Sequence, residues 1–93
     1  MNITSIMSLM DIINYYGKDH QKIKAIEELS ELIKAICKDD KENIKEEIAD
    51  VYIMLSQLRI IYRLDDQIIE KIEDEKIKRT IERMKIFDSH LSG

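Results

Sequence analysis

Apolar residues recur along the chain at the three- and four-residue spacing that puts them on one side of a helix. The clearest run, with intervals alternating between four and three, is Ile44, Ile48, Val51, Leu55, Leu58 and Tyr62. The same criterion applied to the whole chain predicts four helices, over residues 3–16, 20–38, 42–62 and 66–87. Short polar turns separate them, so consecutive helices are expected to run antiparallel. The pattern therefore predicts an all-α fold, an antiparallel four-helix bundle, in a single domain of residues 1–93.

Two of the predicted helices carry more specific expectations about burial. In the second helix, the core stripe is expected to contain Ala25, Leu29, Leu32 and Ile36. The first helix is apolar around most of its circumference and stops at Gly17, a natural helix terminator. One face of a small bundle cannot cover such a helix. We therefore expect it to be buried on two sides, by the bundle core and by a subunit interface.

Composition narrows the class of protein and its partners. The 93 residues are 44% apolar and 37% charged, with no Pro and only two Gly, which argues against a β-rich fold. The net charge of −4 argues against a nucleic acid or an anionic membrane as partner. The single Cys37 cannot form an internal disulfide, and the apolar N-terminal segment is too short and too polar for a membrane span. We expect a cytoplasmic protein.

Two acidic clusters interrupt the second and third predicted helices. They read Glu27-Glu28-x-x-Glu31 and Glu46-Glu47-x-x-Asp50. Within each cluster, two acids three residues apart, Glu28 with Glu31 and Glu47 with Asp50, share a helix face that also carries apolar residues. Because a turn near residues 39 and 40 separates the clusters by similar distances, the two pairs are expected to meet at one level of the bundle.

Four carboxylates crowded together repel one another, and partial burial adds a desolvation cost. Hard divalent cations offset both; Mg²⁺ suits such a site best, with Mn²⁺ as a substitute. More than one ion would permit metal-assisted attack of water on a phosphoryl group. The ordinary alternative, a solvated charged face, stays open at this point. For Glu27 and Glu46, at the flanks, both solvent exposure and a general-base role are open.

Basic residues supply a second candidate group. Lys76, Arg79 and Arg83 share one face of the fourth predicted helix and could neutralise phosphate. Taken alone, they are better explained as solvated charges paired with Glu73, Glu75 and Glu82. Lys24 and Gln21 precede Glu28 by one and two turns, respectively, and could reach a ligand or lie at the surface.

The motif "EELSEL" followed by "EEIADVYIML" resembles the paired signature of the MazG-like, all-α nucleoside triphosphate pyrophosphohydrolases. "YGKDHQKIKAIEEL" and "EKIKRTIERM" are similar to the lead-in and the later basic helix of that family, particularly its small phage and bacterial members. The resemblance implies a homodimer or a dimer of dimers that hydrolyses a nucleoside triphosphate to the monophosphate and pyrophosphate with Mg²⁺.

The same resemblance implies a role for each candidate residue. The metal ligands would be Glu28, Glu31, Glu47 and Asp50. The attacking water would be oriented by Glu27 or Glu46, and the substrate would be held by Gln21, Lys24, Lys76, Arg79 and Arg83. Two alternatives remain at this point: a non-catalytic helical module that binds nucleotide or protein, and a purely structural bundle.

Overall fold

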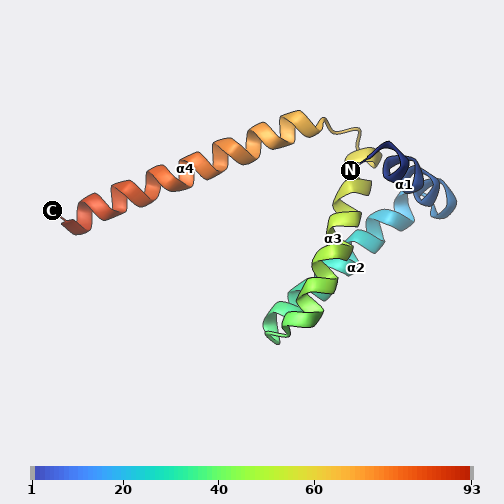
Figure 1. Cartoon of the computed structure of the whole chain (residues 1–93), viewed down its shortest axis with the longest axis horizontal. Helices are drawn as coiled ribbons and strands as arrows, with labels where there is room; N and C mark the ends of the chain where they lie inside the picture. Colours follow the sequence, from blue (N-terminus) through green and yellow to red (C-terminus); the bar gives the residue numbers. More distant parts are fainter. Residues whose placement is uncertain (1, 93) are drawn as a thin grey trace. The chain divides into compact units, whose positions relative to one another are not determined.

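The computed structural model describes residues 2–92, and within this range it contains four α-helices and no strand (Figure 1). They are α1 (Ile3–Tyr16), α2 (Lys18–Cys37), α3 (Lys41–Ile61) and α4 (Asp66–Ser92). The all-α prediction is confirmed. The predicted helix boundaries agree to within two residues except at the end of α4, which continues beyond Phe87 to Ser92. No Pro or Gly lies between Asp66 and Ser92 to stop it.

The chain forms two compact units, Met1–Arg63 with α1 to α3 and Leu64–Gly93 with α4. Packing of α4 against the other helices, which a four-helix bundle requires, stays a prediction. So does the single domain of residues 1–93, whose two terminal residues lie outside the described range. None of the helices in the described part of the chain has the length and apolar character needed to cross a membrane.

Local hydrogen bonds explain where α1 ends and α2 begins. Gly17, the one residue between them, donates its N–H to the Ile13 carbonyl at 2.8 Å and accepts from the Gln21 N–H at 3.1 Å. Its φ of 94° is a conformation that residues with a Cβ rarely adopt. At the other end of α1, the Asn2 side chain caps the helix by accepting from the Ser5 N–H at 2.8 Å.

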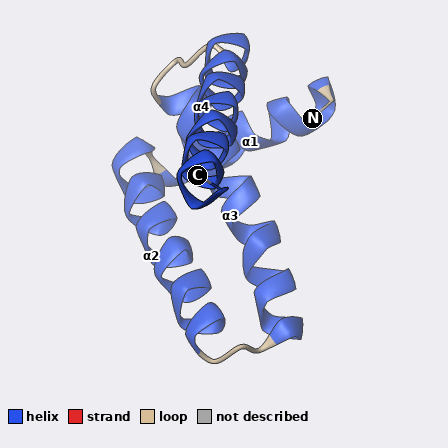
Figure 2. Cartoon of the chain, turned by 90° about the vertical axis from the view of Figure 1, so that its left-hand side faces the viewer, coloured by secondary structure: helices blue, strands red, loops and turns tan. Residues whose placement is uncertain are grey.

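The turn between α2 and α3 sets the register of the two helices. It consists of residues 38–40, with Asp39 in the left-handed region at φ 53°. The side chain of Asp40 caps α3 by accepting from the Asn43 N–H at 3.2 Å. The two helices form an antiparallel hairpin (Figure 2), and α1 packs against both at the end away from this turn.

The core of this hairpin differs from the predicted stripes. The buried residues of α2 are Gln21, Ala25 and Ala35, and those of α3 are Val51, Met54, Gln57 and Ile61. The predicted core positions Leu29 and Ile36 are exposed instead, so these assignments were wrong. In the periodic apolar run of α3, Ile48, Leu55 and Tyr62 are exposed as well. The physical reason is that the inward line of α2 passes through Gln21, Ala25 and the half-buried Glu28, which turns Leu29 away from α3.

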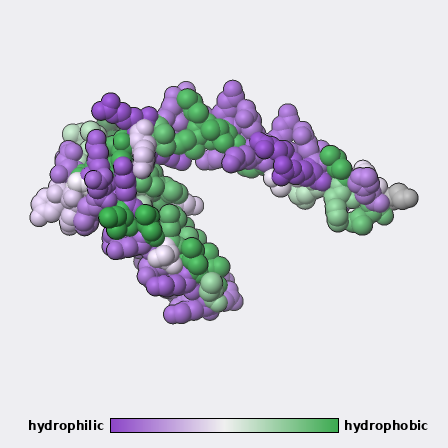
Figure 3. Space-filling model, turned by 180° about the vertical axis from the view of Figure 1, so that it is seen from behind, coloured by the Kyte–Doolittle hydropathy of each residue, from purple (hydrophilic) through white to green (hydrophobic). Residues whose placement is uncertain are grey.

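Large apolar side chains remain exposed on both units (Figure 3). In α1 only Leu9 and Ile13 are buried, whereas Tyr15 is 82% exposed. In α4 no side chain between residues 66 and 91 is buried, although Ile, Met, Phe and Leu residues recur along it. Each unit therefore has apolar surface that its own residues do not cover.

Candidate functional site

Three carboxylates from two helices converge inside the α2–α3 hairpin. Glu28 comes from α2, whereas Glu47 and Asp50 come from α3, and one oxygen atom of each lies within 4.8 Å of the other two. The three-residue spacing of Glu47 and Asp50 places them on one face of α3, and the short turn brings that face opposite Glu28. The sequence predicted this meeting of the two acidic clusters.

Charge crowding and burial perturb two of these groups. Burial raises the pKa of Glu47, and the neighbouring charges of Asp50, Glu28 and Glu31 raise it further. Burial and Glu28 likewise raise the pKa of Asp50. The Oε2 atom of Glu47 is covered from solvent and has no hydrogen-bond partner among the described residues. The group thus contains an acceptor atom that a proton or a cation would satisfy.

Lys24 provides positive charge at the edge of the three carboxylates. Its Nζ lies 3.2 Å from Oε1 of Glu28 and 3.7 Å from Oε2 of Glu27. The hydrogen bond to Glu28 raises the pKa of Lys24, so this side chain stays charged. Its single charge offsets one of the three negative charges and leaves the arrangement electronegative.

The structure does not bring the other predicted acids into this group. Glu31 is half-exposed and pairs with Lys34 at 3.3 Å, although its charge still acts on Glu47. Glu27 pairs with Lys24, and Glu46 is exposed on α3, from where its charge helps to raise the pKa of Asp50. A ligand role for Glu31 and a general-base role for Glu27 or Glu46 stay predictions.

The donor set fits a hard divalent cation. All three converging groups offer oxygen atoms, which Mg²⁺ and Mn²⁺ accept, and the unsatisfied Oε2 of Glu47 is a ready ligand atom. Each carboxylate can bind through one or both oxygens. The identity of the metal and the number of ions stay predictions.

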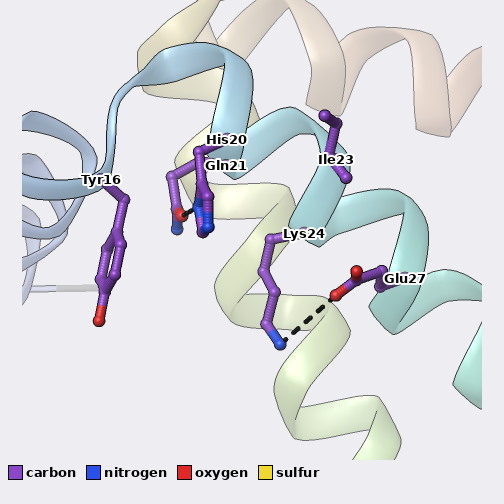
Figure 4. A pocket seen from close by; sticks show the side chains of 6 residues that line it. All are labelled: Tyr16, His20, Gln21, Ile23, Lys24 and Glu27. Atoms are coloured by element: carbon purple, nitrogen blue, oxygen red, sulfur yellow. Dashed lines mark hydrogen bonds and ion pairs between the residues drawn. The ribbon is translucent and has the colours of Figure 1, made fainter.

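A pocket of about 370 Å³ adjoins the carboxylates (Figure 4). It is lined by Tyr16, His20, Gln21, Ile23, Lys24 and Glu27. The pocket and the carboxylates are continuous through Lys24, which lines the pocket and also binds Glu28. Of the predicted substrate-binding residues, Gln21 and Lys24 therefore lie together in a hollow beside the candidate metal ligands.

Sequence analysis missed the polar contact behind this pocket. Gln21 is 4% exposed and Gln57 is 2% exposed, and the Nε2 of Gln21 donates to the Oε1 of Gln57 at 2.8 Å. Gln57 lies seven residues after Asp50, two helical turns along the same face of α3. That spacing was the available signal. His20, whose ring stacks on that of Tyr16 with 5.1 Å between centroids, was not predicted as a site residue either.

The three predicted phosphate-binding residues lie in the other unit. Lys76, Arg79 and Arg83 are all exposed on α4. Their spacing of three and four residues puts them on one face of that helix. A contact between this face and a substrate stays a prediction.

Comparison with known proteins gave one finding. The family model described as MazG nucleotide pyrophosphohydrolase domain matches residues 18–86. This range contains α2, α3, both acidic clusters and the basic residues of α4. No curated protein and no solved structure gave a significant match.

Proposed function

Because the chain belongs to the MazG nucleotide pyrophosphohydrolase domain family, we propose that it hydrolyses a nucleoside triphosphate to the monophosphate and pyrophosphate. The observation that carries this proposal is the convergence of Glu28, Glu47 and Asp50, with an unsatisfied oxygen on Glu47. Such a group has no stabilising role in an isolated hairpin, because repulsion and desolvation both act against it. A bound cation would offset both the repulsion and the desolvation of these three carboxylates.

In this proposal, Glu28, Glu47 and Asp50 hold Mg²⁺, with Mn²⁺ as a substitute, and Glu31 joins them as the fourth ligand. When bound, the cation would neutralise the phosphate charge and polarise the phosphorus centre that water attacks. The raised pKa values of Glu47 and Asp50 support this assignment, because crowded carboxylates that resist ionisation gain most from a cation.

The remaining side chains would bind substrate and move the proton. Glu27 or Glu46 would accept a proton from the attacking water, since each lies next in sequence to a proposed ligand and is not itself one. Lys24 would contact the phosphates beside the carboxylates, and Lys76, Arg79 and Arg83 would supply further positive charge to them. The pocket lined by Gln21 would receive the nucleoside, since its volume is within the range of small-molecule sites.

We also propose that the protein is a homodimer or a dimer of dimers. The apolar side chains of α1 that the α1–α3 unit leaves uncovered support this, because apolar surface left in water is costly and a partner subunit would cover it. Light scattering coupled to size exclusion should give at least twice the 11.0 kDa chain mass. A monomer throughout the micromolar range would contradict this part of the proposal.

Pyrophosphate release from a panel of ribo- and deoxynucleoside triphosphates tests the activity. With Mg²⁺, we expect pyrophosphate and not orthophosphate, and orders of magnitude less of it from Glu47→Gln. The matched control is Glu42→Gln on the same helix, whose carboxylate is 83% exposed and pairs with Lys45; it should retain full activity. Nucleotide binding without turnover would instead support a non-catalytic binding module, and equal activity of wild type and Glu47→Gln would refute the proposed site.

A further inference from the structure

A chain of hydrogen bonds runs from the interior of the α2–α3 hairpin to the wall of the pocket. It begins at Gln57, whose Nε2 donates to the Sδ of Met54 at 3.7 Å. The Oε1 of Gln57 accepts from the Nε2 of Gln21 at 2.8 Å, and the Oε1 of Gln21 lies 2.8 Å from the Nδ1 of His20. Gln57 and Gln21 are both buried, whereas His20 is exposed and lines the pocket.

The direction of each bond in this chain determines the next one. An amide oxygen can only accept, so the bond between Gln21 and His20 requires the proton on Nδ1 of the imidazole. Gln21 presents its oxygen to His20 because its NH₂ group is already directed at the oxygen of Gln57. Through Gln21, the orientation of the buried Gln57 amide thereby selects the tautomer of the exposed His20 ring.

Burial makes this selection firm. If Gln21 alone turned its amide over, its oxygen would face the oxygen of Gln57 in a space that solvent hardly enters. Unpaired polar groups at such positions are strongly disfavoured. The orientation of the ring is held from a second side, because His20 stacks on Tyr16 with an angle of 16° between the ring planes.

With Nδ1 occupied by Gln21, the ring nitrogen available to a ligand is Nε2. In the neutral Nδ1–H tautomer this atom is a hydrogen-bond acceptor. His20 lines the same pocket as Lys24, which is in contact with the candidate metal ligands. In Figure 4, Tyr16 and His20 lie at one end of the pocket and Lys24 with Glu27 at the other. A substrate with its phosphates near Lys24 would therefore extend its nucleoside toward His20.

We infer that Gln57 is a positioning residue which, through Gln21, holds His20 in the Nδ1–H tautomer, so that Nε2 accepts a hydrogen bond from the nucleoside of the substrate. This inference rests on the proposed function and names the part of the substrate that the pocket reads. Gln57 itself does not touch the ligand, because it is enclosed between α2 and α3. Donor groups on the nucleoside, such as a ring N–H, an exocyclic amine or a sugar hydroxyl, are the partners that Nε2 would accept.

The tautomer is measurable without any activity, from the ¹⁵N chemical shifts of the His20 ring at alkaline pH. We expect the proton on Nδ1 in the wild type and a loss of that preference in Gln57→Met, which removes the acceptor at nearly constant volume. Glu42→Gln is the matched control, because Glu42 is exposed on the same helix and takes no part in this chain of hydrogen bonds, and it should keep the wild-type tautomer. A wild-type ring protonated on Nε2, or a Gln57→Met ring that keeps the Nδ1 proton, would overturn the inference.

Ligand contact is tested on the same resonances. Deoxynucleoside monophosphates should shift the Nε2 signal of His20, whereas inorganic pyrophosphate, which has no nucleoside, should not. If Gln57→Met fails to fold, His20→Ala tests the contact with the nucleoside, because His20 is exposed and its removal leaves the core unchanged. His20→Ala should raise KM by about two- to tenfold with a smaller change in kcat.

The outcomes separate this inference from the proposed function. Pyrophosphate release that His20→Ala leaves unchanged in KM would sink the inference while the hydrolase proposal stands. Monophosphates that shift the His20 signal in a protein without turnover would sink the hydrolase proposal while the nucleoside contact stands.

Discussion

Replacing Glu47 by Gln should stabilise the metal-free protein and destabilise the Mg²⁺-loaded one relative to wild type. Three carboxylates and the ammonium of Lys24 leave two net negative charges, which one divalent cation balances. Glu47→Gln lowers that excess to a single charge and gives the covered Oε2 position a neutral amide. Without metal, the melting temperature should rise, because the variant removes repulsion that the fold otherwise carries.

With Mg²⁺ present, the order of the two proteins should reverse. At a concentration one hundred times its Kd, an ion that binds only the folded state stabilises it by about 2.7 kcal/mol. For a chain of this length that is a shift of roughly 10–20 °C in melting temperature. If loss of one of three ligands weakens binding about a hundredfold, the same Mg²⁺ stabilises Glu47→Gln by only about 0.4 kcal/mol.

Thermal melts monitored by circular dichroism, with EDTA or with Mg²⁺, measure both effects. Glu42→Gln is the control, since its exposed ion pair is worth no more than about 1 kcal/mol and its response to Mg²⁺ should equal that of wild type. The reasoning is refuted if Glu47→Gln melts below wild type in EDTA, because the carboxylate would then be stabilising. It is also refuted if Mg²⁺ stabilises both proteins equally.

Three further predictions concern pH, the buried amides and the link between α1 and α2. Folding raises the pKa values of Glu47 and Asp50, so between the ordinary values of 4.5 and 3.8 and the raised values the folded state binds more protons than the unfolded state. Without metal, the free energy of unfolding should therefore fall as the pH rises through this range. Urea titrations that show it rising instead would contradict the prediction. Gln21→Met and Gln57→Met should each lower the free energy of unfolding by about 1–3 kcal/mol, because each leaves the other amide without its partner. The double variant should lose less than the sum of the two, since neither amide is then left unpaired. Additive losses in the same urea titrations would mean that the two side chains do not interact. Gly17→Ala should lower the free energy of unfolding by about 1–3 kcal/mol, because a φ of 94° is strained for alanine even though no atom lies within 4 Å of the added Cβ. An unchanged urea midpoint would show that the backbone between α1 and α2 shifts to relieve the strain.

The helices and the meeting of the acidic clusters could be predicted because both follow from local rules. Periodic apolar residues located α1 to α4, and Gly17 marked the end of the first helix. Once α2 and α3 were joined by a short turn, the three-residue spacing within each acidic cluster was enough to bring Glu28 near Glu47 and Asp50.

The core of the hairpin could not be predicted in the same way. Hydrophobicity favoured Leu29 and Leu55 as core residues, yet the buried line contains Gln21 and Gln57. A rule that buries the most apolar residues fails where polar groups are directed inward and satisfy one another, because the pairing partner is 36 residues away in sequence. The spacing of Gln57 from Asp50 shows that the two share a face of α3, but it does not reveal that Gln21 of α2 is the partner of Gln57.

The turn at residues 38–40 also constrains which length changes this chain can tolerate. One residue inserted before Glu47 within α3 would rotate the following acids by about 100° and move them by about 1.5 Å along the helix. Glu47 and Asp50 would then point away from Glu28, although every side chain of the site was still present. Insertions and deletions between Glu28 and Glu47 should therefore be far rarer among descendants of this sequence than substitutions at the exposed positions in the same stretch. In this hairpin, the number of residues between the acids is inherited together with the acids themselves.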